Sequence, residues 1–313
     1  MTNIREFRAI GAETWPSLPL GGWRDTCATL QLWTQVVGKI RLALAPPVNH
    51  WWHVPLYVTC SGLTTSPIPY GARRFQIDFD FLHHRLAIQT SDGATESFPL
   101  QPRSVAEFYS EVMKRLCALG INVQIWTTPV EIPDPITFEE DRIHSAYDPT
   151  HVHRLWCILV QADRILTVFR ARFCGKASPV HFFWGSFDLA VTRFSGRLAP
   201  PHPGAHNVAD RVSREAYCNE VSSCGFWPGG AGMEQPVFYS YAYPPPLGFA
   251  AATVRPVAAS YSDALGEFIL PYDDVRQAES PDDALLDFLQ STYEVAARLG
   301  RWDRASLERA VSR

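Results

Sequence analysis

The chain has 313 residues, enough to bury a large hydrophobic core in one large domain or in two ordinary ones. Hydrophobic residues make up 46% of it and charged residues 19%, which excludes extensive disorder and is typical of a packed globular protein. The formal net charge of -4 provides no positive field for phosphate backbones, so we expect no nucleic-acid partner.

The cysteines and the apolar segments indicate where the protein works. Seven cysteines are an odd number, and no two of them form a C-x-x-C pair, so we interpret them as reduced thiols. The first residues contain no apolar segment of signal-peptide length, and no later apolar run is long enough to span a bilayer. We therefore expect a cytoplasmic protein with no membrane partner. Its oligomeric state is left open.

Hydrophobic side chains recur at helical spacing in four segments. These segments are residues 24–44, 103–119, 150–172 and 280–300. The second begins with Ser104 and Glu107 at the spacing of a capping box and ends at Gly120. The fourth begins at Ser280, with Pro281 in its first turn. Four helices are therefore expected.

Segments rich in aromatic and β-branched residues lie between these helices and predict strands. They are residues 51–60, 74–81, 85–90 and 180–195. Short strands of this kind, separated by turns and packed against helices, indicate an α+β fold with largely antiparallel strands.

Two parts of the chain resemble each other. "LQLWTQVVGKIRLAL" and "HRLWCILVQADRILT" both contain Leu-Trp in a predicted helix, and "PVNHWWH" and "SPVHFFW" follow them as strands that combine histidine with aromatic residues. We interpret residues 1–135 and 136–313 as two similar helix-sheet-helix units, with a Gly, Pro and aromatic-rich excursion at about 196–262 in the second. One compact pseudo-symmetric domain is the alternative.

The stretch "SPVHFFWGSFDLAVTRFSGR" predicts a β-hairpin with Gly185 and Ser186 at the centre of a two-residue turn. This register pairs Trp184 with Phe187, Phe182 with Leu189 and Val180 with Val191. Arg193 and Arg197 then continue the apolar face beyond these pairs. Guanidinium groups there need either acidic partners within the protein or a bound anion.

Several histidines are candidates for acid/base chemistry. His181 lies diagonal to Asp188 on the other face of the hairpin, where the carboxylate could orient the imidazole for catalysis or simply form a structural hydrogen bond. His202 and His206 have the spacing of helical metal ligands, but Pro203 and Gly204 between them indicate a loop. No specific zinc motif is present, and the pairs His50/His53 and His151/His153 add none.

The excursion supplies further candidates. If "REAYCNEVSSCGFW" is extended, Glu220 lies between small side chains, as a general base beside a ligand or as the partner of an arginine. Arg214 is a further candidate for anion binding. In "FYSYAYPPP", Tyr239 and Tyr241 lie on one side of a strand and either line a pocket or pack in the core. The nucleotide-binding and nucleophile-elbow motifs are missing, so the sequence provides no case for a nucleotide cofactor or a serine hydrolase. The cofactor is left unknown, and a metal is possible without a specific motif to support it.

The chain resembles a bacterial family known only as a domain of unknown function. The resemblance rests on "NHWWHVPLYVT", "PRSVAEFY", "SPVHFFWGSFDLAVTRFSGR" and "FYSYAYP", among other strings, and covers nearly the whole length. It implies a soluble bacterial protein and assigns no catalytic residue.

Together these features favour a soluble enzyme that acts on a small anionic metabolite, a carboxylate or a phosphate. Arginines 193, 197 and 214 would bind the anion, and His202 with Glu220 would move protons. A non-catalytic small-molecule-binding or sensor protein is one alternative. A protein-interaction module that uses the aromatic and proline-rich excursion is another.

Overall fold

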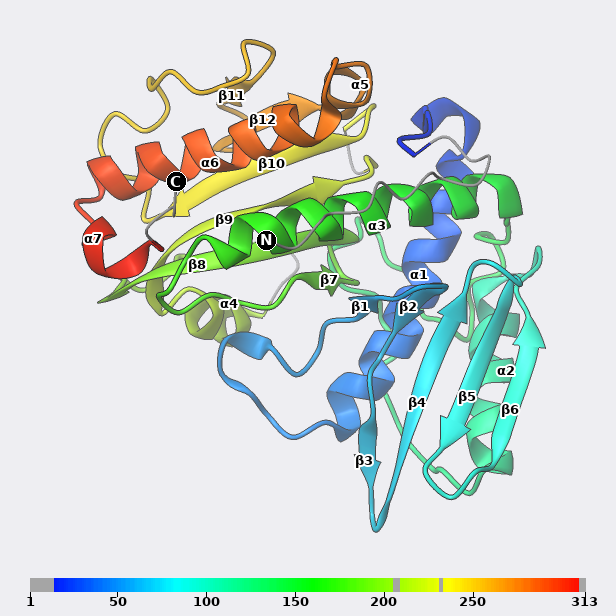
Figure 1. Ribbon diagram of the computed structural model, residues 1–313. Helices are drawn as coiled ribbons and strands as arrows, with labels where there is room; N and C mark the ends of the chain where they lie inside the picture. Colours follow the sequence, from blue (N-terminus) through cyan, green and yellow to red (C-terminus); the bar gives the residue numbers. More distant parts are fainter. Residues whose placement is uncertain (1–13, 205–208, 231–232, 310–313) are drawn as a thin grey trace, which may run out of the picture.

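The computed structural model describes residues 14–204, 209–230 and 233–309. In this part of the chain, seven α-helices and two six-stranded antiparallel sheets form the mixed α+β architecture that the sequence predicts (Figure 1). The long helices are α1 (Arg24–Leu44), α2 (Val105–Ala118), α3 (Pro149–Ala171) and α6 (Pro281–Leu299). The short ones are α4 (Asp210–Ala216), α5 (Tyr272–Arg276) and α7 (Arg304–Leu307), and 3-10 turns occur at η1 (Leu20–Gly22) and η2 (Asn49–Trp51).

The four predicted helices are confirmed as α1, α2, α3 and α6. Three of them, α2, α3 and α6, begin with a capping side chain. Ser104 and Glu107 form the predicted capping box at the start of α2. Asp148 caps α3 by accepting hydrogen bonds from two backbone N–H groups, and Ser280 caps α6. Each cap satisfies amides that would otherwise lack a partner, so the helix starts where the sequence places it.

The first sheet has the order β1-β2-β4-β5-β6, and β3 pairs with β4. Its strands are β1 (Tyr57–Val58), β2 (Gly62–Thr64), β3 (Ile68–Tyr70), β4 (Arg73–Asp80), β5 (Arg85–Thr90) and β6 (Thr95–Pro99). Hydrophobic and polar residues alternate along β4, so the sheet buries one face. Phe79 and Phe98 on that face pack against Phe108 of α2, which stacks on Trp33 of α1 at 4.5 Å between ring centroids.

The strand predicted at 51–60 is wrong for most of its length. Only Tyr57–Val58 pairs as β1, and η2 precedes it with His50 and Trp51 at φ angles of 59° and 62°. The aromatic residues that suggested a strand pack instead against the second sheet, where Trp52 and His50 contact Phe194. Tertiary packing of these rings outweighs their β propensity.

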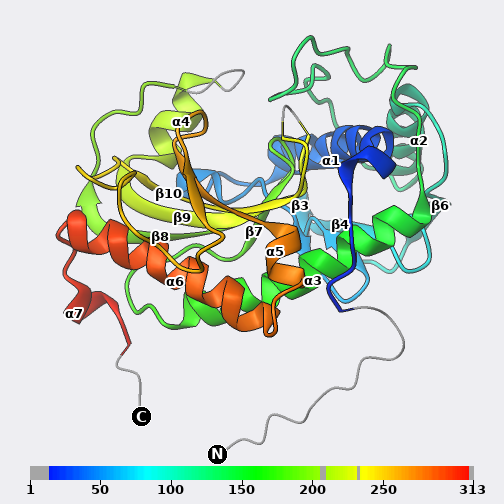
Figure 2. The same ribbon diagram turned by 90° about the horizontal axis from the view of Figure 1, so that it is seen from above.

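The second sheet has the order β11-β12-β10-β9-β8-β7. Its strands are β7 (His181–Phe183), β8 (Asp188–Leu198), β9 (Asn219–Trp227), β10 (Val237–Tyr243), β11 (Ser260–Ser262) and β12 (Glu267–Pro271). Figure 2 shows α3 and α6 along one side of this sheet, with α4 and α1 on the other. The face towards α3 and α6 is therefore covered by two long helices that contact β8, β9 and β10.

Two strands of this sheet lie within residues 196–262, the segment interpreted as an excursion. β9 and β10 lie in the middle of the sheet, between β8 and β12. A long helix, a sheet and a second helix do follow one another in each half of the chain. The fold does not confirm an internal duplication, and the division into units stays a prediction.

One hydrophobic core cluster runs through both sheets. The two sheets are also joined by two backbone hydrogen bonds of 2.9 Å between Leu56 and Phe182.

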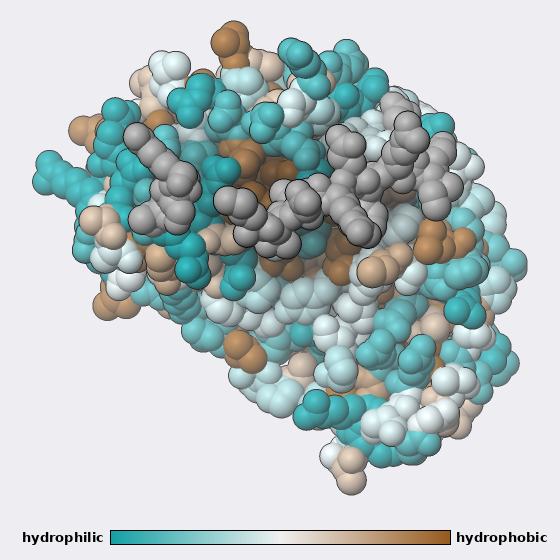
Figure 3. Space-filling model, in the orientation of Figure 1, coloured by the Kyte–Doolittle hydropathy of each residue, from teal (hydrophilic) through white to brown (hydrophobic). Residues whose placement is uncertain are grey.

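The surface is mostly hydrophilic on the side that carries α3 and α6. Figure 3 shows hydrophobic side chains there as scattered single residues and within a hollow of the upper half. Among the helices of the described ranges, none has the length and apolar character needed to cross a membrane.

Candidate functional site

The face of the second sheet that points away from α3 and α6 is unusually polar. Thr192 lies opposite Ser223, and Ser223 opposite Tyr241, with 2.9 Å between the Thr192 and Ser223 hydroxyls. Ala190 and Gly225 form the neighbouring row with Tyr239. By strand alternation, the face carries Asp188, Ala190, Thr192, Ser223, Gly225, Tyr239, Tyr241 and Glu267, and we call this set the polar face. Its central residues, Ala190 and Gly225, are small, and hydroxyl and carboxyl groups of the other residues lie around them.

Asp188 is the most buried carboxyl of the polar face, with a relative exposure of 7%. It accepts short hydrogen bonds from the hydroxyls of Ser186 and Tyr239. Burial raises the pKa of Asp188, and these two hydrogen bonds oppose the rise because they stabilise the charged form. Tyr239 is held as a neutral phenol, since burial and the nearby Asp188 raise its pKa well above the ordinary value.

Two further carboxyls lie near Asp188. Burial, and then the charge of Asp188, raise the pKa of Glu131 from 4.5 to about 7, and the same two causes raise the pKa of Glu267 to about 7. Glu131 approaches the hairpin at Gly185, where an added Cβ would lie 2.1 Å from the Glu131 Oε1 atom. Both glutamates can therefore hold or release a proton near neutral pH.

Helix α1 fixes the segment that carries Glu131. The Gln35 side chain donates to the Val130 carbonyl at 2.8 Å and accepts from the Val130 N–H at 2.9 Å. Gln31 donates to the Gly185 carbonyl at 2.7 Å and so connects the same helix to the hairpin. Glu131 itself has a φ of 58°, a conformation that a non-glycine residue adopts only when its surroundings enforce it.

A cluster of aromatic residues borders the other side of the polar face. The hydroxyls of Tyr217 and Tyr241 lie 2.8 Å apart. His202 stacks on Tyr217 with ring centroids 4.6 Å apart and lies 4.7 Å from the Tyr243 ring. Burial raises the pKa of Tyr217 to about 12 and lowers that of His202, so both are neutral near pH 7. Neutral phenols in such a place can donate to oxygen atoms of a ligand.

The structure does not bring the three candidate arginines together. Arg193 lies on the opposite face of the sheet with 1% exposure, and its guanidinium is 3.5 Å from the centre of the Phe169 ring. It donates to the Phe169 carbonyl, and burial lowers its pKa to about 10. Arg214 lies on α4 and pairs at 3.5 Å with Asp210, both side chains being exposed. An anion could not contact these guanidinium groups at the same time.

Glu220 forms the salt bridge that was the alternative to its role as a base. Its carboxylate lies 2.6 Å from Nη2 and 2.9 Å from Nε of Arg197, and the Ser195 hydroxyl donates to it at 2.8 Å. Arg197 also donates to the carbonyls of Gly300 and Arg301. Ser222 and Cys224, which share a face of β9 with Glu220, are buried, and α3 and α6 pack against this strand.

The hairpin keeps its predicted register but not its predicted turn. Phe182 pairs with Leu189 as predicted, but the strands end at Phe183 and Asp188, so four residues connect them instead of two. Phe187, the last of these four, has a positive φ of 61°. The predicted Asp188–His181 hydrogen bond is absent, because Asp188 binds the Ser186 and Tyr239 hydroxyls. Neither ring nitrogen of His181 has a hydrogen-bond partner.

Across residues 14–204, 209–230 and 233–309, no group of three or more histidine, cysteine or acidic side chains could hold a metal ion. His206 lies outside the described residues, and the His202 Nδ1 atom accepts from the Gly204 N–H at 3.1 Å. Lys176 donates to the Nε2 atom of His50 at 2.6 Å, while His50 Nδ1 lies 3.1 Å from the Ala216 carbonyl. These contacts leave His50 no free nitrogen for a metal.

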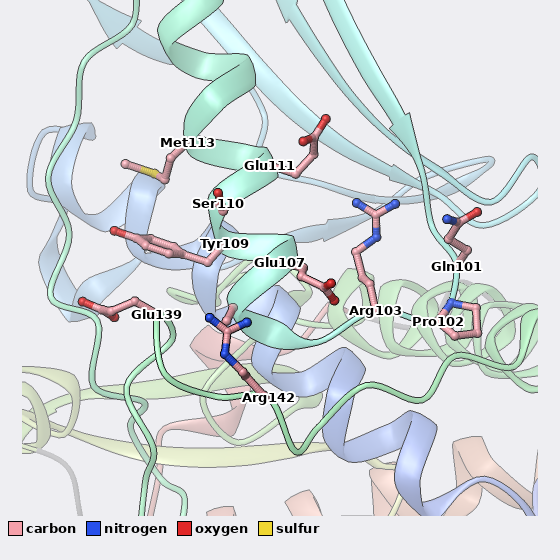
Figure 4. A pocket seen from close by; sticks show the side chains of 11 residues that line it. Gln101, Pro102, Arg103, Glu107, Tyr109, Ser110, Glu111, Met113, Glu139 and Arg142 are labelled. Atoms are coloured by element: carbon pink, nitrogen blue, oxygen red, sulfur yellow. The ribbon is translucent and has the colours of Figure 1, made fainter.

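A groove of about 870 Å³ runs along α2. Figure 4 shows Glu107 between Arg103 and Arg142 in this groove. Glu107 is engaged in the helix cap, and Glu111 pairs with Arg115 at 2.6 Å. Acidic and basic side chains alternate in this groove, and some of them already pair with other residues of the protein. The groove therefore lacks the converging polar groups of the polar face.

Sequence reasoning missed Glu131, Glu267 and Tyr217. Glu131 lies in the segment "PVEIPDP", which has no periodicity to place it, and only the tertiary contacts of α1 bring it to the hairpin. Glu267 precedes the apolar residues of a short strand, so alternation could have placed it on the face opposite Phe268. Tyr217 immediately follows α4, and its position depends on how α4 packs.

Neither the curated proteins nor the solved structures gave a match to this chain. The model of a family of unknown function, DUF5996, matches residues 15–309 and thus includes both sheets and the polar face. The chain therefore belongs to the DUF5996 family.

Proposed function

We propose that this protein is an enzyme that transfers protons on a small polar metabolite bound at the polar face. The observation that carries the proposal is the position of Glu131 and Glu267 near Asp188, with pKa values of about 7 for both glutamates. A general acid or base is most effective when its pKa lies near the working pH. Burial, together with repulsion from the neighbouring Asp188, brings the pKa of these carboxyls into that range without any histidine.

Each group has a role that follows from its surroundings. Glu131 is the acid/base residue, because the contacts of α1 hold it in place and its pKa permits both protonation states. Asp188 positions the Tyr239 hydroxyl through their hydrogen bond. Tyr241 and Tyr217 are neutral phenols and can donate to an oxygen of the ligand.

The charge of the polar face restricts the part of the ligand that binds beside the carboxyls. Asp188, Glu131 and Glu267 lie there, whereas Arg193 and Arg197 engage other groups. A hydroxyl or amino group suits such surroundings, and an anionic group would be repelled. The proposal thus keeps an enzyme with a small metabolite but gives the three arginines no part in the chemistry.

The first experiment is native and denaturing mass spectrometry of gently purified protein, followed by a screen of metabolites for an increase in melting temperature. With the ligand found, Glu131→Gln should reduce turnover about 100-fold or more and leave ligand affinity within a few-fold. Asp163→Asn is the matched control, because Asp163 on α3 is also a half-buried carboxyl, with a pKa raised by burial to about 6. Asp163→Asn should leave turnover unchanged.

Two outcomes would favour the other hypotheses. If Glu131→Gln preserves both affinity and biological function, the chain is a non-catalytic binding or sensor protein. If no metabolite binds and a protein partner is captured, the interaction module gains support. Of the residues of that module, Tyr239 is buried, Tyr241 and Trp227 are at most partly exposed, and Leu247 beside the prolines is exposed.

A further inference from the structure

His181 is a buried imidazole with no partner. His181 is the first residue of β7 and is 1% exposed. Among the described residues, neither of its ring nitrogens has a hydrogen-bond partner. Aromatic rings surround it, with Tyr57 at 5.6 Å and Trp52 at 5.9 Å between centroids. A neutral imidazole always carries one N–H, and leaving it unpaired in the interior costs about 1–3 kcal/mol. Buried polar groups of native proteins normally have partners, so something should bind this N–H.

Arg41 lies against the same tyrosine. Its guanidinium carbon is 5.3 Å from the centre of the Tyr57 ring, and Nε donates to the His53 carbonyl at 2.7 Å. The Nη1 atom is buried and has no partner, and within the described part of the chain Arg41 forms no ion pair with a carboxylate. Arg41 also forms a side-chain hydrogen bond with Tyr57, so only its Nη1 atom lacks an acceptor. The Arg41 guanidinium and the His181 ring, whose N–H likewise lacks an acceptor, both contact the Tyr57 ring.

The electrostatics select the kind of group that fits between them. Burial and then the positive charges of Arg41 and Arg170 lower the pKa of His181 to about 3, so the imidazole is neutral. The same charges make the surroundings positive. A water molecule could satisfy one nitrogen but would leave the partly buried charge of Arg41 uncompensated. A carboxylate has two oxygens and can accept from both donors while neutralising the charge.

We infer that Arg41, Tyr57 and His181 form a binding subsite for a carboxylate group. The subsite continues the polar face, because His181 pairs with Ala190, and Ala190 with Gly225, in one row across the sheet. A molecule with a carboxylate at the His181 end and a hydroxyl or amino group at the Asp188 end would match both. This assignment to a single ligand rests on the proposed function, whereas the subsite itself does not.

Acetate is the probe for the subsite. The histidine ring nitrogens are labelled with ¹⁵N in the full chain, and the His181 signals are assigned by their loss in His181→Phe. Increasing acetate should shift the His181 signals with saturation, and chloride at equal ionic strength should not. Arg41→Met should weaken acetate binding about tenfold or more, because a charge-assisted hydrogen bond is lost. Arg41→Lys keeps the charge without the planar fork and should bind with intermediate affinity. Arg74→Met, at an exposed arginine of β4, is the control and should bind as the wild type does.

Either of two results would overturn the inference. His181 signals that do not respond to acetate would mean that only water occupies the space. Equal acetate affinity in wild type, Arg41→Met and Arg41→Lys would place the bound anion elsewhere. The variant Glu131→Gln separates this inference from the proposed function. It should bind acetate as the wild type does, whether or not Glu131 has a catalytic role. A free carboxylate ion and a larger ligand are told apart by whether a metabolite found in the screen displaces acetate.

Discussion

Replacing Glu131 by glutamine should change how the stability of the protein depends on pH. The unfolded chain releases this proton near the ordinary pKa of 4.5, whereas the folded protein holds it to about 7. Between these pH values the folded state binds more protons, so the free energy of unfolding falls as pH rises. The rise of the pKa from 4.5 to about 7 corresponds to about 3 kcal/mol. Glu131→Gln removes the titrating group. Its free energy of unfolding relative to wild type should therefore increase by up to about 3 kcal/mol between pH 4.5 and pH 8.

The assay is urea denaturation of both proteins at several pH values and constant ionic strength. Glu308→Gln serves as a control of opposite sign. Burial alone would raise the pKa of Glu308, but hydrogen bonds from Arg304 and Tyr293 lower it overall. The Glu308 carboxylate therefore adds stability above its unfolded pKa, and the variant should lose stability relative to wild type as pH rises. Parallel curves for wild type and Glu131→Gln would refute the reasoning, because Glu131 would then titrate alike in the folded and unfolded states.

Other predictions concern packing and stability. Arg193→Met should leave the free energy of unfolding within about 1 kcal/mol of wild type or raise it. The side chain contacts Phe169, but its buried Nε has no hydrogen-bond partner. A loss above about 3 kcal/mol in urea denaturation would contradict this. Gly225→Ala should cost about 1–3 kcal/mol, because the added Cβ would lie 2.1 Å from a backbone carbonyl oxygen, while Gly21→Ala meets nothing within 4 Å and should melt like wild type. Ser104→Ala should cost about 1 kcal/mol by removing the cap of α2, as measured by the urea midpoint.

Local signals explain what could be predicted of the fold. The long helices carry amphipathic periodicity and capping residues, so α1, α2, α3 and α6 were predictable to within two residues or so. Alternation likewise predicted β4 and β5 and placed Tyr239 and Tyr241 on one side of β10. The segment 51–60 failed because its aromatic residues pack across the second sheet, and no local pattern reports such a contact.

The candidate site was less predictable because its parts come from distant segments. Asp188 and the two tyrosines could be singled out from strand alternation, but Glu131 reaches them only through Gln31 and Gln35 of α1. The expectation of an anion site was tied to Arg193 and Arg197, whereas the inferred carboxylate subsite uses Arg41 on the first long helix. Which arginine lacks an acidic partner depends on tertiary contacts, and a single sequence does not contain that information directly.

The contact between α1 and the Glu131 segment also determines how the chain can be divided. Glu131 lies before residue 135, in the half that contains the first sheet, while Asp188, Tyr239 and Glu267 lie in the other half. A fragment that began at residue 136 would contain the whole second sheet and still lack the proposed acid/base residue. The two halves are thus interdependent in the way that subunits sharing one active site are, although a single polypeptide joins them. Loss of the proposed activity on cutting the chain there, and its recovery on mixing the two fragments, would be the behaviour of such a shared site.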